Sequence, residues 1–448
     1  MRGKNSILLA GVAFGVLTTA MSDALAGGFA IREQSVYGQG ASFAGIAAGG
    51  ALSGMFWNPA VMTQFGGFNL ENGLSGIIPN ASHSFSASTL ATLIPPLYGF
   101  GVDNSGRDAL VPSFYASMQL SERFWIGMSV NAPFGLSVGF PTAWAGAGYA
   151  QNTSLKTYNA APSVAFKVNE WLSIAAGIQI QYSDAALDGF YAPGLPGLLS
   201  PSKFNISGTG WGWGWTVGAT LTPTPTTTIG IGYRSAIDQD VDGSLAVPVL
   251  PLLNTPGGVS LTLKLPSTLT VGLRQRIGER FTFLAGFEWA EWSRIGSPAV
   301  QFAGGGTAAV LGTPLILPFQ YSDGFFYSIG GEYVVDQNLT VRAGFAYEQT
   351  PITDRVRTPR LPDNDRFWYS VGASYKPSVF PGLSFDLAYS FIDVESTPIN
   401  ISSPSNPWFN ATGTYIGNVN SSVHILSLGA RFQFSPPPPA APALVSKG

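Results

Sequence analysis

The chain has 448 residues, a formal net charge of −3 and no cysteine. The absence of cysteine excludes disulfides and thiolate metal sites. The lack of a basic patch argues against nucleic acid as a partner. Only 10% of the residues are charged, against about 25% in an average soluble domain, which favours a membrane protein. Beyond the N-terminus, however, no run of about 18 apolar residues is present to form a spanning helix.

The first 26 residues have the organisation of a secretion signal. Arg2 and Lys4 give a charged start, residues 7–17 form an apolar stretch too short to span a bilayer, and Ala24-Leu25-Ala26 is a small-residue cleavage motif. We predict that this segment is removed and that the mature chain starts at Gly27. A retained membrane anchor is the alternative, which the short apolar stretch disfavours.

The following segment, residues 27–66, lacks the alternation of a strand and is rich in glycine and alanine. It contains Pro59, which forbids a central strand. A barrel of intermediate size has an open lumen that a compact segment of this kind would fill. We predict a hatch here, with marker residues Gly27, Phe29, Asn58, Pro59 and Ala60. A disordered leader is the alternative, which the apolar content disfavours.

In the remainder of the chain, residues 67–434, the pattern of apolar and polar residues repeats every two positions. Alternation of apolar and polar residues places each set on one face of a strand. Fourteen segments fit, at roughly 68–78, 109–120, 124–136, 153–168, 171–184, 205–221, 226–240, 259–277, 280–294, 322–335, 338–350, 366–377, 382–395 and 421–434. Short turns and long loops alternate between them, as in bacterial barrels. We predict an all-β fold: a closed antiparallel 14-stranded transmembrane β-barrel in the outer membrane of a Gram-negative bacterium, with both termini in the periplasm.

Two of the predicted outer loops are unusually apolar. One contains Leu187, Phe190, Tyr191, Leu195, Leu198 and Leu199, and the other contains Val247, Val249, Leu250, Leu252 and Leu253. Exposed apolar patches usually mark binding, so we predict a groove that captures an apolar ligand. The alternative is that the loops bury these side chains on each other, and the two interpretations are compatible.

The third predicted strand contains Pro133-Phe134-Gly135. Proline removes a ladder donor and glycine weakens a strand, so pairing should break here. A break in the wall would let an apolar ligand leave sideways into the outer leaflet. From the residues alone, an ordinary strand end is the simpler alternative.

Three tryptophans, Trp211, Trp213 and Trp215, alternate with glycines. We predict that the indoles face lipid near an interface, as in aromatic girdles, and that the glycine face leaves lumen space for the hatch or a ligand. Stacking of a ligand on the tryptophans is the minor alternative.

Catalysis and metal binding have no support in the sequence. The chain has two histidines, His83 and His424, and neither lies in a cluster with metal-ligand spacing. No sequence context selects a Ser-His-Asp arrangement. We predict that the protein is not an enzyme and uses no cofactor or metal. Asp363 and Asp365 beside Arg366 are most simply a salt-bridged loop.

Several motifs, in order along the mature chain, resemble the FadL-type family of outer-membrane transporters for long-chain fatty acids and hydrocarbons. They are Gly27-Gly28-Phe29-Ala30-Ile31, Asn58-Pro59-Ala60, Asn131-Ala132-Pro133-Phe134-Gly135-Leu136, Pro162 with Lys167-Val168-Asn169-Glu170-Trp171-Leu172-Ser173, and Pro362-Asp363-Asn364-Asp365-Arg366-Phe367-Trp368. The resemblance implies a fourteen-stranded barrel, closed by an N-terminal hatch, that passes hydrophobic molecules. It also implies that the apolar loops are the first capture site and that the third strand is kinked.

Two features depart from the family pattern. Members hold a fatty-acid carboxylate with basic side chains, but the stretches that correspond best, 182–188 and 320–327, contain no lysine or arginine. The substrate is then a neutral hydrocarbon or aromatic, unless Arg32, Arg274 or Arg294 substitutes. In addition, the barrel is expected to end at Phe434, and the proline-rich tail, residues 435–448, should be extended or disordered in the periplasm.

The sequence therefore predicts a passive channel whose partners are hydrophobic small molecules, such as fatty acids and hydrocarbons, and outer-membrane lipid. We expect a monomer. A general porin for polar solutes is the alternative, which the predicted plug and the low charge disfavour. A barrel enzyme or an adhesin is a third class.

Overall fold

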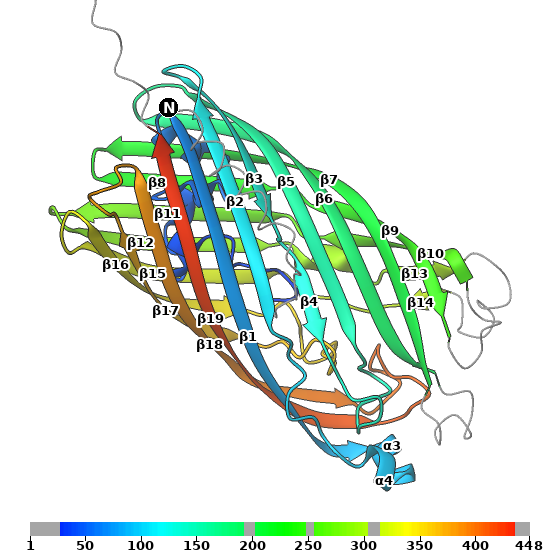
Figure 1. The fold of residues 1–448 in the computed structure, drawn as a ribbon. Helices are drawn as coiled ribbons and strands as arrows, with labels where there is room; N and C mark the ends of the chain where they lie inside the picture. The colour runs from blue at the N-terminus through cyan, green and yellow to red at the C-terminus, as the bar shows by residue number, and fades with distance from the viewer. Residues whose placement is uncertain (1–26, 192–201, 248–254, 303–313, 435–448) are drawn as a thin grey trace, which may run out of the picture.

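The barrel closes as one antiparallel sheet around a lumen (Figure 1). This computed structural model describes residues 27–191, 202–247, 255–302 and 314–434. The sheet has fourteen barrel strands and five additional strands, and it closes where β1 (Phe68–Ser88) pairs with both β2 (Ala109–Gln119) and β19 (Tyr415–Phe434). The predicted fold class is confirmed. The predicted signal peptide and tail lie outside the described residues and stay predictions.

The other strands follow in chain order. They are β3 (Phe124–Asn131), β4 (Gly135–Val138), β5 (Thr153–Lys167), β6 (Leu172–Tyr191), β7 (Ser202–Thr224), β8 (Thr227–Arg234), β9 (Ile237–Ala246), β10 (Thr255–Leu265), β11 (Thr268–Ile277), β12 (Phe281–Ala290), β13 (Ala299–Phe302), β14 (Leu315–Ile316), β15 (Gly324–Val334), β16 (Leu339–Gln349), β17 (Arg366–Tyr375) and β18 (Leu383–Ile401). Two short helices, α3 (Thr89–Leu93) and α4 (Pro95–Tyr98), follow β1, and the 3₁₀ turn η6 (Trp292–Ile295) follows β12. No helix in the described ranges is long and apolar enough to cross a membrane.

Strands next to the long loops extend further than the alternation predicted. β1 continues to Ser88 and β19 begins at Tyr415, and their ladder joins Phe68 to Phe434 at one end and Ser88 to Tyr415 at the other. In these added residues serine and asparagine occupy mainly one face, whereas Ala81, His83, Tyr415 and Val419 on the other face are buried. The outward face of this extension lacks the apolar residues that mark the lipid face of a crossing, so the strand signal is weak there.

Three crossings are interrupted at similar points of the wall. The third is divided between β3 and β4, the seventh between β8 and β9, and the eighth between β10 and β11. The last two interruptions are neighbours, because Arg234 pairs with Thr268 on one side of them and Ile237 pairs with Leu265 on the other. The break at Pro133 was predicted from the sequence; the other two were not.

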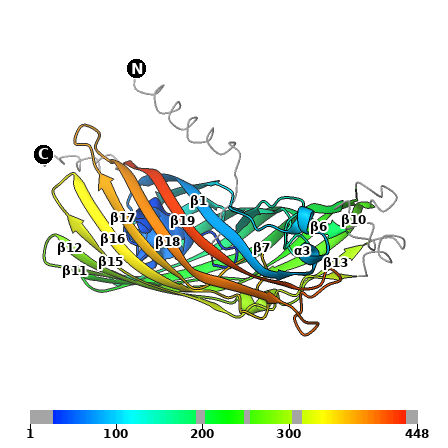
Figure 2. The same cartoon turned by 90° about the horizontal axis from the view of Figure 1, so that it is seen from below.

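Residues 27–66, called the hatch segment below, lie inside the barrel as a compact group of turns (Figures 1 and 2). They contain α2 (Val36–Gln39) and three 3₁₀ turns, η2 (Ile46–Ala48), η3 (Leu52–Phe56) and η4 (Pro59–Gln64). Nearly every side chain from Phe29 to Met62 is buried.

Glycines in the wall let the backbone of the hatch segment approach directly. A Cβ atom at Gly230 would lie 1.8 Å from the carbonyl oxygen of Ala47, and one at Gly344 would lie 2.2 Å from the backbone of Ala41. Such contacts are possible only without a side chain. Asn58 adds polar anchors, since its Nδ2 donates to the carbonyl oxygens of Ala47 at 2.8 Å and of the β7 strand at 2.9 Å.

The tryptophan–glycine stretch of β7 is only partly as predicted. Trp211, Trp213 and Trp215 are exposed by 57%, 64% and 50%, which fits the lipid face. The glycine face, however, leaves no lumen space: a Cβ at Gly210 would lie 1.8 Å from the carbonyl oxygen of Asp240 in β9. The glycines are needed because β9 pairs with β7 after the interruption of the seventh crossing and approaches it too closely for a Cβ atom.

Candidate ligand cavity

A cavity lies in the lumen where the hatch segment meets all three interruptions of the wall. Its lining includes Pro133 and Phe134, Arg234, Ser235 and Ile237, Pro266 and Thr268, together with Ile31, Phe56, Trp57, Gln179, Trp292 and Phe326. An interrupted ladder redirects side chains inward, which explains why the three breaks converge here. The free volume is about 70 Å³, enough for a few waters but too small for a long acyl chain. Admission of such a ligand requires a lining segment to move.

The start of the hatch segment, residues 27–34, covers the break in the third crossing from inside. The backbone N–H of Ile31 donates to the carbonyl oxygen of Pro133 at 2.8 Å, and the N–H of Gly135 donates to the carbonyl oxygen of Phe29 at 2.9 Å. The Gln34 side chain donates to the carbonyl oxygen of Ala132 at 2.8 Å. Backbone groups freed by the break are therefore satisfied by this hatch start and, at Phe134, by the side chain of Thr157 in β5.

The wall beside this break lacks ladder hydrogen bonds. β2 and β3 pair only as far as Phe114 and Val130, although β2 continues to Ala109 against β1. Further along, a single bridge joins Gly106 to Val138. Between these points, within the described residues, β2 has no strand partner on the side of β4. The barrel is consequently held there by side chains and by the hatch start.

A cluster of three aromatic side chains packs at the break in the third crossing. The Phe29 ring lies 4.6 Å from that of Trp292 and 6.1 Å from that of Phe134, in edge-to-face geometry. The predicted hatch residues Gly27 and Phe29 and the predicted exit residues Pro133, Phe134 and Gly135 are thus brought together.

The other predicted hatch residues, Asn58, Pro59 and Ala60, lie elsewhere. Asn58 also bonds the hydroxyl of Thr220 in β7, at 3.2 Å. They hold the segment to the wall and lie away from the predicted exit.

Arg234 lines the cavity beside Arg32 and was not predicted from the sequence. Its guanidinium donates to the carbonyl oxygen of Phe56 at 3.0 Å, to Asn159 Oδ1 at 3.4 Å and to Gln179 Oε1. It also lies 4.2 Å from the centre of the Phe56 ring. Among the described residues no carboxylate pairs with it, so a buried positive charge faces the cavity with neutral partners only.

The three arginines considered from sequence are all neutralised. Arg32 Nη2 lies 3.0 Å from Glu288 Oε1, Arg274 is paired with Glu332 at 3.1 Å, and Arg294 is paired with Asp238 at 2.7 Å. The sequence did not indicate Arg234 as a site residue, because its partners Phe56, Asn159 and Gln179 come from three distant segments.

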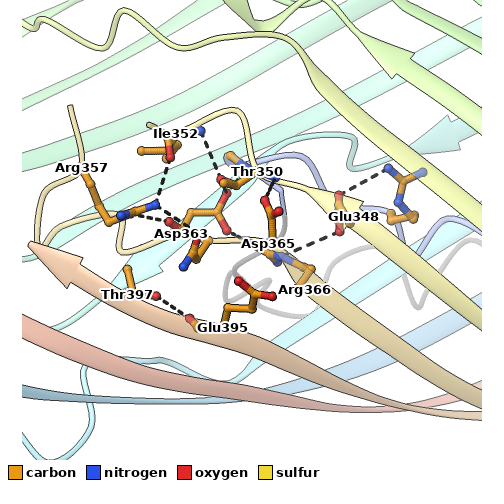
Figure 3. A network of polar contacts seen from close by, with 12 residues as sticks. Glu348, Thr350, Ile352, Arg357, Asp363, Asp365, Arg366, Glu395 and Thr397 are labelled. Carbon is orange, nitrogen blue, oxygen red and sulfur yellow. Dashed lines mark hydrogen bonds and ion pairs between the residues drawn. The ribbon is translucent and has the colours of Figure 1, made fainter. Parts of the chain in front are cut away.

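A polar network borders the cavity on the side of β16 and β17 (Figure 3). Glu348 accepts from the Trp368 indole N–H at 3.0 Å, and Arg366 forms an ion pair with Asp363. The predicted salt-bridged loop is therefore confirmed for Asp363. Asp365 instead accepts from the backbone N–H of Thr350 at 2.9 Å.

The predicted outer-loop groove is largely outside the described residues. Leu195, Leu198, Leu199, Val249, Leu250, Leu252 and Leu253 all lie there. Of the rest, Leu187 and Phe190 are half-buried in β6 and Val247 is buried. Phe190 packs with one apolar cluster and Val247 with another, and Tyr191 ends β6. The described part does not bring the two loops together, so the groove stays a prediction.

The chain matches one family model over residues 17–434, described as outer membrane protein transport protein (OMPP1/FadL/TodX). It is 26% identical to the long-chain fatty acid transport protein of Salmonella typhi, covering 87% of this chain and 92% of that one. It is also 26% identical to outer membrane protein P1 of Haemophilus influenzae, covering 93% and 98%.

Solved structures share the fold. A FadL homologue of Pseudomonas aeruginosa superimposes with a TM-score of 0.79 at 24% identity, covering 91% of this chain and all of that one. The Pseudomonas putida toluene transporter TodX gives a TM-score of 0.63 at 17% identity, with coverage of 91% and 100%.

Proposed function

Because the chain belongs to the OMPP1/FadL/TodX family of outer-membrane transport proteins, we propose that it passes amphipathic hydrocarbons with a carboxylate end, of the long-chain fatty acid class, passively through the outer membrane. The ligand would enter from the loop side, occupy the cavity with its polar end at Arg234, and leave sideways between β2 and the interrupted third crossing. No covalent step is involved.

The observation that carries this proposal is the coincidence of three features at one place. The cavity has a largely apolar lining in which Arg32 is paired with Glu288 and Glu348 while Arg234 forms no ion pair with any described residue. It lies against the wall section without ladder bonds, and the hatch start separates the cavity from that section. A buried charge without a counter-ion is costly, so a ligand carboxylate that pairs with Arg234 gains both Coulomb energy and hydrogen bonds.

The proposal revises the expectation of a neutral substrate. That expectation followed from the absence of basic residues in two stretches of sequence, and Arg234 lies in neither of them. The names of two relatives point to both substrate classes, fatty acids for one and toluene for the other. The guanidinium favours the carboxylate class.

Competition binding with matched ligands tests this assignment. Arg234→Met keeps the length of the side chain and removes the charge. A hydrogen bond to a charged group contributes about 1.5–3 kcal/mol, so the variant should bind a fatty acid about 10- to 150-fold more weakly. Binding of the alcohol of equal chain length should change little.

Arg294→Gln is the control, because Arg294 is partly exposed and paired with Asp238. An Arg234→Met variant that loses the alcohol and the fatty acid equally would indicate a damaged cavity and would contradict the role of the charge. Equal binding of the fatty acid by wild type and variant would remove Arg234 from the site.

A further inference from the structure

The hatch start brings Gly27, the predicted first residue of the mature chain, against a buried carboxylate. A Cβ atom built on Gly27 would lie 2.3 Å from Glu348 Oε1 and 2.9 Å from its Cδ. The next residue is held by Asp363, whose Oδ2 accepts from the backbone N–H of Gly28 at 2.9 Å. Gly27 also lines the ligand cavity.

The charges around this point do not balance. Glu348 and Asp363 are buried beside it, the half-buried Glu288 lines the same cavity, and the buried Glu33 interacts with Glu348. Among the described residues, two guanidinium groups form ion pairs with them: Arg32 contacts Glu288 and Glu348, and Arg366 contacts Glu348 and Asp363. Arg234 lines the same cavity but forms no ion pair with any of the four, so the carboxylates still outnumber the guanidinium groups. The nearby Arg357 forms its ion pair with Asp354 instead.

One oxygen of these carboxylates lacks a partner. Glu33 is 2% exposed, and its Oε2 has no hydrogen-bond partner. Burial raises the pKa of Glu33 to about 7, and Glu348 adds to the shift. Excess buried negative charge of this kind is costly unless a cation joins it.

We propose that the α-ammonium group of Gly27, created by cleavage of the signal peptide, is that cation, and that it fixes the hatch start against the break in the third crossing. Hydrolysis of the Ala26–Gly27 bond by a signal peptidase adds the oxygen of one water to the carbonyl carbon of Ala26. The Gly27 nitrogen keeps the electron pair of the broken bond and is protonated. An uncharged amide with one N–H thereby becomes an ammonium with three donors.

In this proposal, cleavage of the signal peptide completes the attachment of the hatch start inside the lumen. Before cleavage the Gly27 nitrogen is a neutral amide and carries a further residue, which leaves the carboxylates with excess negative charge. After cleavage the ammonium ties the segment to Glu348, and the bonds of Phe29 and Ile31 to Pro133 and Gly135 complete the wall. The inference rests on the predicted cleavage site and goes beyond the transport activity.

Amine labelling of the native protein tests it. Trypsin releases Gly27–Arg32, a peptide without lysine, so any label on it reports the α-amine alone. In the folded barrel in detergent, an amine-reactive ester at neutral pH should label this amine about tenfold more slowly than in the unfolded chain. The exposed Lys376 should be labelled at similar rates in both states.

Variants separate the ion pair from simple burial. Glu348→Gln and Asp363→Asn should each speed labelling of the α-amine several-fold while the barrel keeps its heat-modifiable migration. Glu170→Gln, in an exposed turn next to Lys167, should leave the rate unchanged.

Three results would overturn the proposal. They are a mature peptide that starts at another residue, equal labelling of the folded and unfolded wild type, and protection that survives both cluster substitutions. None of them bears on substrate binding, which is measured separately through Arg234. Failure of this inference and failure of the proposed function are therefore distinguishable.

Discussion

The hatch start, residues 27–34, and the hatch body, residues 36–64, share one lumen but are held in different ways. The body meets wall glycines through its own backbone, at distances that admit no side chain. The start is held by hydrogen bonds to a strand that is already interrupted and by polar contacts of Gly28 and Arg32 with Asp363, Glu288 and Glu348, and it borders a cavity. Close-packed interfaces resist change, whereas contacts at a break can be exchanged. Under the proposed function we therefore expect the start, rather than the body, to move when a ligand enters.

Removal of both parts should have the largest effect. Deletion of residues 30–64 should leave a foldable barrel, because the strands pair with each other around the full sheet. Its single-channel conductance in a planar bilayer should exceed that of the intact protein several-fold. An unchanged conductance would mean that the hatch segment does not close the lumen.

Disturbing the body alone should have the next largest effect. Gly230→Ala places a Cβ against the carbonyl oxygen of Ala47, and overpacking of this kind costs about 1–3 kcal/mol. The variant should melt earlier and leak small solutes. Gly76→Ala is the matched control, since its nearest contact would be 3.6 Å away. Equal melting temperatures of the two variants would contradict a close contact between the hatch body and the wall.

Fixing the start should affect transport without affecting stability. Ala30 and Phe134 form an antiparallel bridge, and such partners have Cα atoms about 4.5–5.5 Å apart, within disulfide range. In a chain without native cysteine, Ala30→Cys with Phe134→Cys should form a disulfide that blocks uptake of a labelled fatty acid. Reduction should restore uptake. Full uptake by the oxidised protein would place the exit elsewhere.

The repeated strands of the barrel could be predicted from the sequence, whereas features that depend on contacts between distant strands could not. Period-2 alternation locates strands because lipid and lumen impose it on every crossing. Pro133 marked one interruption of the wall. Pro266 lies at another interruption and could have marked it in the same way. The break at Ser235 has no such mark. Arg234 was missed because its role depends on neighbours from separate crossings, which local pattern does not reveal.

The seam between β1 and β19 has a consequence for biogenesis. Phe68 and Phe434, at the first and last positions of the sheet, are paired directly, and their rings lie 5.5 Å apart. The sheet thus cannot become edgeless until the final strand has been delivered, and every earlier state exposes two unpaired edges. Such edges invite association between chains. Insertion of this protein must therefore shield both edges until the last twenty residues of the sheet have arrived.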